Sequence, residues 1–90
     1  MDRVTNEKLE KYFKITEEAL EKAKKAKKLD NNADIVIDMV SRYLEDAKHF
    51  RDKGDLVTAF AALNYAHGWL DCGARLKLFD VKDSRLFTSD

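Results

Sequence analysis

Four polar side chains recur along one margin of the apolar stretch 56–76. His67, Asp71 and Arg75 follow one another at intervals of four residues, and Asn64 lies three residues before His67. In a helix this spacing brings neighbouring members within reach of one another, so Asp71 could hold the His67 ring and pair with Arg75. Such a cluster suits a small anion or the edge of a nucleotide, or it is a surface ion pair beside a histidine at the core margin.

The helix that precedes this stretch adds two further candidates. Because Asp71 and Arg75 lie beside an apolar face, we expect them to be paired with each other or with polar groups such as Asp46, since an unpaired charge is costly to desolvate. The sequence therefore predicts one polar groove, lined by Asn64, His67, Asp71, Arg75, Tyr43 and Asp46. A metal site needs three or four ligands and this cluster supplies two. We expect no metal, no cofactor and no catalytic residue.

A second candidate surface is aromatic. Tyr65, Trp69 and Leu76 share one helical edge with Cys72. These side chains can pack beneath the first helix or the C-terminal segment. They can also form a partner interface or a homodimer seam, because aromatic residues are enriched at the centres of protein interfaces. The apolar neighbours of Cys72 favour packing over a reactive thiolate.

Arg42 and His49 could perform different chemistry. Six residues separate them, which fits the arginine–histidine spacing of ribonucleases in the helical HEPN superfamily, and the chain resembles HEPN domains loosely in its size and its alanine-rich hairpin. Here the pair lies in the middle helix rather than late in the bundle, where that superfamily carries it. Five lysines between Lys22 and Lys28 either complement a helix dipole or contact phosphates.

Composition narrows the classes of function. Ninety residues make one domain. The 17 basic and 17 acidic residues cancel, which disfavours a cationic nucleic-acid module without excluding a local patch. The single cysteine cannot form an internal disulfide. No apolar run approaches the roughly 20 residues that span a bilayer, and the first residues lack the apolar stretch of a signal peptide. We therefore expect a cytoplasmic protein with no membrane contact.

The hydrophobic periodicity predicts three helices in one domain, residues 1–90. Thr5 and Asp55 are suitable N-caps, and Gly54 suits the left-handed position that ends a helix. The very short connection at Gly54 predicts an antiparallel hairpin. An up-and-down three-helix bundle, all-α, buries the three apolar stripes. The expected elements are helix one at about 5–29, helix two at about 32–53, helix three at about 55–77 and a short C-terminal tail at 78–90.

Helix three differs from the other two in composition. Apolar residues cover most of its circumference, with the small side chains Ala59, Ala62, Ala66 and Gly73 between larger ones. Small residues allow helices to approach closely. We therefore expect helix three to be the most buried element, wedged between both neighbours.

The stretch 42–81 carries a family resemblance. It contains Arg-Tyr-Leu-Glu-Asp-Ala at 42–47, Lys-Gly-Asp at 53–55 and Asn-Tyr-Ala-His-Gly-Trp-Leu-Asp at 64–71. These strings resemble the archaeal family catalogued as domain of unknown function 357. The resemblance implies a small helical bundle from an archaeon and brings no activity with it. We interpret the chain as a non-enzymatic helical module that binds an unknown protein partner or a second copy. The alternative is a HEPN-like domain that uses Arg42 and His49 on nucleic acid.

Overall fold

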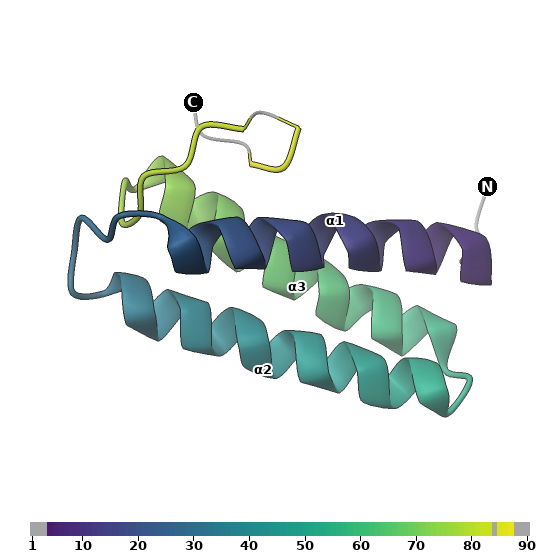
Figure 1. Ribbon diagram of the computed structural model, residues 1–90. Helices are drawn as coiled ribbons and strands as arrows, with labels where there is room; N and C mark the ends of the chain where they lie inside the picture. Colours follow the sequence, from purple (N-terminus) through teal and green to yellow (C-terminus); the bar gives the residue numbers. More distant parts are fainter. Residues whose placement is uncertain (1–3, 84, 88–90) are drawn as a thin grey trace.

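The computed structural model describes residues 4–83 and 85–87; residues 1–3, 84 and 88–90, which include part of the expected tail, lie outside the described residues. Three helices follow one another: α1 (Asn6–Lys25), α2 (Ala33–Asp52) and α3 (Leu56–Arg75). They run up, down and up (Figure 1). The described residues form no β-strand, only an isolated bridge between Lys28 and Phe79. The predicted all-α, three-helix bundle is confirmed.

The helix ends follow the predicted capping chemistry. The Thr5 hydroxyl accepts a hydrogen bond from the Lys8 backbone N–H at 3.1 Å, and the Asp55 carboxylate accepts one from the Thr58 N–H at 3.1 Å. Gly54 has a φ of +83°, and the Asp55 N–H donates back to the Phe50 carbonyl at 2.9 Å. This is a Schellman motif. The predicted caps and the tight α2–α3 hairpin are confirmed.

The first helix ends earlier than expected. α1 stops at Lys25 rather than near residue 29, because the residues that follow pair with the chain beyond α3. The Leu29 N–H donates to the Leu78 carbonyl at 2.8 Å, and the Asp80 N–H donates to the Lys27 carbonyl at 3.0 Å. Residues 27–29 therefore pair with residues 78–80 instead of forming the expected last turn of α1.

The end of α3 also turns sharply, two residues before the expected end at 77. Lys77 adopts a left-handed conformation, with φ of +59°, and the Leu78 N–H donates to the Gly73 carbonyl at 2.9 Å. This second Schellman motif directs the C-terminal segment back along the bundle (Figure 1). The segment is anchored by its buried apolar side chains, namely Leu78, Phe79, Leu86 and Phe87.

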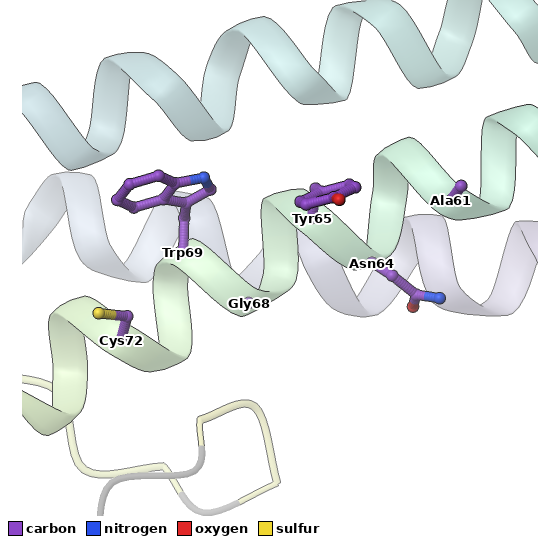
Figure 2. A pocket seen from close by; sticks show the side chains of 6 residues that line it. All are labelled: Ala61, Asn64, Tyr65, Gly68, Trp69 and Cys72. Carbon is purple, nitrogen blue, oxygen red and sulfur yellow. The ribbon is translucent and has the colours of Figure 1, made fainter.

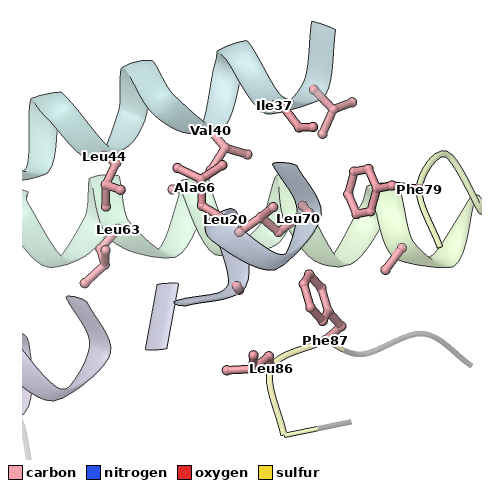
Figure 3. Packing of buried hydrophobic residues seen from close by; sticks show 14 of the residues in the cluster. Leu20, Ile37, Val40, Leu44, Leu63, Ala66, Leu70, Phe79, Leu86 and Phe87 are labelled. Carbon is pink, nitrogen blue, oxygen red and sulfur yellow. The ribbon is translucent and has the colours of Figure 1, made fainter. Parts of the chain in front are cut away.

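The core lies where the hairpin meets α1 and this segment. α2 and α3 pack against each other along their lengths, and α1 contacts α3 more than α2. Side chains from all three helices meet in one cluster that includes Leu20, Val40, Leu44, Leu63 and Leu70 (Figure 3). Ala59, Ala66 and Gly73 of α3 are buried as predicted. As expected, α3 packs against both α1 and α2. The expectation that it is the most buried element is wrong, because six residues are buried in each of the three helices and Tyr65 and Trp69 lie exposed on one edge of α3.

Two glycines of α3 offer a matched test of this packing. A Cβ built on Gly73 would lie 2.6 Å from Phe79 Cε1, whereas one built on Gly68 would meet nothing within 4 Å. Gly73→Ala should lower the free energy of unfolding by about 1–3 kcal/mol, because the buried ring must move. Gly68→Ala should raise it by about 0.5–1 kcal/mol, because alanine favours a helix. Urea denaturation at low protein concentration measures both. A stability gain in both variants would contradict the Gly73–Phe79 contact.

Candidate functional site

The predicted polar groove exists in part, between α1, α3 and the C-terminal segment. It has a volume of about 340 Å³ and is lined by Tyr12, Ile15, Thr16, Leu63, Asn64, His67, Gly68, Asp71 and Arg85. Three of the six residues predicted for the groove therefore lie together there: Asn64, His67 and Asp71. Thr16 and Arg85 could not be foreseen, because Thr16 enters the groove through the packing of α1 on α3 and Arg85 enters it through the docking of the C-terminal segment.

His67 is held by the chain itself. Its Nε2 lies 2.8 Å from the Leu86 backbone oxygen, and its Nδ1 lies 3.1 Å from the Thr16 hydroxyl. Because a carbonyl only accepts, Nε2 carries a proton and donates to Leu86; in the neutral ring Nδ1 then accepts from the Thr16 hydroxyl. Asp71 Oδ1 lies further away, 3.8 Å from Nε2. Both ring nitrogens thus tie α3 to α1 and to the C-terminal segment.

Ion pairs fasten the same segment to α1. Lys22 Nζ lies 3.0 Å from Asp83 Oδ2, and the Arg85 guanidinium pairs with Glu18. The hydrogen bond from Lys22, followed by one from the Arg85 backbone N–H, lowers the pKa of Asp83. Glu18 raises the pKa of Arg85. Because the pKa of Asp83 is lower in the folded chain than its ordinary value, the ionised Asp83 carboxylate stabilises the fold when the pH is above that ordinary value. This stabilisation is lost as the pH falls through the lowered pKa. The segment is therefore fastened at neutral pH.

The other residues predicted for the groove lie elsewhere. Tyr43 stacks on Tyr65, with ring centroids 5.5 Å apart and planes inclined by 15°. Asp46 is exposed on α2, and Arg75 is exposed at the end of α3. The physical reason is that the His67 margin of α3 faces α1, whereas α2 packs on a different side of α3. Residues of α2 and the His67 margin therefore do not share one groove.

A larger depression opens on the side of the hairpin away from α1. It has a volume of about 640 Å³ and is lined by Ala61, Asn64, Tyr65, Gly68, Trp69 and Cys72 (Figure 2). Tyr65 and Trp69 are 63% and 36% exposed, and Leu76 beyond them is 64% exposed. The expectation that this edge packs beneath helix one or the C-terminal segment is wrong. The alternative, an edge available for an interface, fits their exposure.

The start of α3 and one ring of α2 extend this apolar surface. Val57 is 70% exposed and lies one helical turn before Ala61. The Tyr43–Tyr65 stack joins the two helices. We call this surface the open face and define it as Tyr43, Val57, Ala61, Tyr65, Gly68, Trp69, Cys72 and Leu76. Between Leu56 and Leu70, α3 carries no Asp, Glu, Lys or Arg, so its outward side lacks the charges found on α1 and α2.

The candidate nuclease pair lies apart from both depressions. Arg42 has a 75% exposed side chain and pairs with Asp38 at 2.9 Å on the same helix. His49 is exposed and contacts the Phe50 ring edge to face, with centroids 5.3 Å apart. Neither residue lines the polar groove or the larger depression beside Tyr65 and Trp69.

The lysine run at the end of α1 is partly engaged within the chain. Lys22 pairs with Asp83, Lys24 lies 3.7 Å from Glu21, and Lys28 donates to the Lys24 carbonyl at 3.0 Å. Over residues 4–83 and 85–87, no three His, Cys, Asp or Glu side chains group closely enough to hold a metal ion. In the same part of the chain, no helix combines the length and the apolar character needed to cross a membrane.

The two hydrogen bonds of His67 predict a structural effect. His67→Ala should lower the free energy of unfolding by about 1–3 kcal/mol, because the Leu86 carbonyl and the Thr16 hydroxyl lose their partner. Asn64→Ala, in the same groove but exposed, is the control and should change stability by less than about 0.5 kcal/mol. Thermal denaturation of both variants measures the difference. Equal stability of His67→Ala and the unmodified chain would show that the segment docks without this residue.

Comparison with known proteins places the chain in a family. A family model described as "Protein of unknown function (DUF357)" matches residues 11–79. The match takes in most of α1, all of α2 and α3, and the turn that brings Phe79 against Gly73. No curated protein and no solved structure matches the chain significantly. The resemblance seen in the Asn64–Asp71 string is thus confirmed over more than three quarters of the sequence, and the chain belongs to the DUF357 family.

Proposed function

We propose that the protein is a non-enzymatic helical module that binds another protein chain through the open face. The observation that carries this proposal is the exposure of Tyr65 and Trp69 on a depression of about 640 Å³. An apolar surface of this kind on a small protein marks an interaction site more often than chance exposure. Aromatic side chains also dominate the energetics of interfaces that have been dissected by mutation.

The geometry of the face favours binding in two ways. Tyr65 is already stacked on Tyr43, so a partner meets an ordered ring and less side-chain entropy is lost on binding. The centre of the face, from Ala61 to Trp69, carries no charge. Covering it therefore buries apolar area, worth roughly 25 cal/mol per Å², without desolvating an ion.

The shape of the face suits a helix as the bound element. Small residues, Ala61 and Gly68, alternate along α3 with the larger Tyr65 and Trp69. Ridges of large side chains with hollows between them are what a second helix packs against. A partner helix on this side would complete a four-helix arrangement around the hairpin.

Other functions receive less support from the described residues. His67 uses both ring nitrogens within the chain, which removes the best candidate for acid–base work. For the nucleic-acid alternative, Arg42 already pairs with Asp38, and the net charge is zero. We therefore favour protein binding over a HEPN-like activity of Arg42 and His49.

Site-specific photocross-linking tests this function. A benzoylphenylalanine at position 65, with the same probe at the exposed α1 position Lys14 as the matched control, is placed in extract of the source cells with and without nuclease. We expect protein adducts from position 65 only, unchanged by nuclease. Equal adducts from both positions, or adducts lost on nuclease treatment, would contradict the proposal.

A further inference from the structure

We propose that the chain bound on the open face is a second copy, with the two α3 helices packed antiparallel about a two-fold axis. This inference rests on the proposed function and names its partner. It follows from the order of side chains along the outward side of α3, from their sizes and from their lack of charge.

The spacing of the exposed residues along the outward side of α3 is the same in both directions of the chain. Six exposed residues form it: Val57, Ala61, Tyr65, Gly68, Cys72 and Leu76. They are separated by 4, 4, 3, 4 and 4 positions. Spacings of three and four keep residues on one helical face. Because the series is symmetric about its middle, an antiparallel second copy presents the same row in register, as a two-fold interface requires.

The sizes of the paired residues are complementary. A two-fold axis midway between Tyr65 and Gly68 sets Tyr65 against Gly68 of the second copy and Ala61 against Cys72 of the second copy. The outer pair is Val57 with Leu76 of the second copy. A Cβ added at Gly68 would meet nothing within 4 Å, so Gly68 leaves open space where the facing Tyr65 would lie, with one face of that tyrosine ring still stacked on Tyr43 of its own chain.

Charge is consistent with self-pairing. In an isologous interface, any residue near the axis lies close to its own copy, so a charge there repels itself. The residues nearest the axis, from Ala61 to Leu70, include no Asp, Glu, Lys or Arg, and His67 faces α1 and the C-terminal segment. Arg75, at the end of the row, falls opposite Thr58 of the second copy rather than opposite another cation.

Disulfide trapping tests the register. In the proposed dimer the two native Cys72 residues are eleven positions apart along the axis, which is about 16 Å at the rise of an α-helix, too far for a disulfide. Ala61→Cys should therefore form a covalent dimer under oxidised glutathione, through Cys72 of the second copy, while the unmodified chain should not. Lys14→Cys is the control and should behave like the unmodified chain. Equal trapping of all three would overturn the register.

Sedimentation equilibrium tests the hollow. Gly68→Leu fills the place of the facing Tyr65 ring, so it should raise the dimer dissociation constant at least about tenfold, a loss typical of one good interface contact. Its far-ultraviolet circular dichroism should be unchanged, because the site is open in the single chain. Self-association that survives Gly68→Leu would overturn the proposed dimer.

The outcomes separate this inference from the proposed function. A chain that stays monomeric at every concentration, yet still cross-links another protein from position 65, overturns the second copy and keeps protein binding. A chain that neither self-associates nor cross-links from position 65 overturns both.

Discussion

The close packing of α3 against its neighbours at Gly73 governs how the rest of the molecule is arranged. The absence of a side chain there lets the Phe79 ring lie against the α3 backbone, at a point where Val36 of α2 also lies close to Gly73. With Phe79 in this place, the C-terminal segment pairs with residues 27–29 and continues over α1. The segment then supplies the Leu86 carbonyl to His67. One close approach thus links the hairpin, α1 and the chain end.

This arrangement gives the hairpin two different sides. On one side, α1 and the C-terminal segment cover α3, and the polar groups there are used for internal hydrogen bonds and ion pairs. On the other side nothing in the described residues covers Tyr65, Trp69 and Leu76. The polar groove is therefore best understood as the place where the chain closes on itself. The open face is the side on which we propose that a protein binds.

Much of the fold was predictable because local rules decide it. Thr5, Gly54 and Asp55 act through caps and a left-handed turn, which depend on residues only a few positions away. The end of α1 was not predictable, since residues 27–29 take their conformation from backbone groups about fifty positions later.

The groove was predicted only in part, for a similar reason. The groove residues on α3 could be predicted because helical spacing places them on one side of that helix. Thr16 and Arg85 line the groove only because of tertiary packing. Tyr43 does not line it, because α2 packs on a different side of α3. The exposure of Tyr65 could not be predicted from the sequence. A helical wheel shows the direction in which a side chain points, but it does not show whether another helix lies on that side.

The central claim is that the open face is where this molecule meets another chain. Trp69 is the single tryptophan and lies on that face, so its fluorescence reports directly whether the face is covered. The most direct measurement is the quenching of Trp69 by acrylamide while the protein is concentrated from dilute solution. We expect quenching to weaken and the emission to move to shorter wavelength as association proceeds, because the indole becomes shielded from water. Constant quenching across the range in which the chain associates would place the contact on another surface and contradict this account.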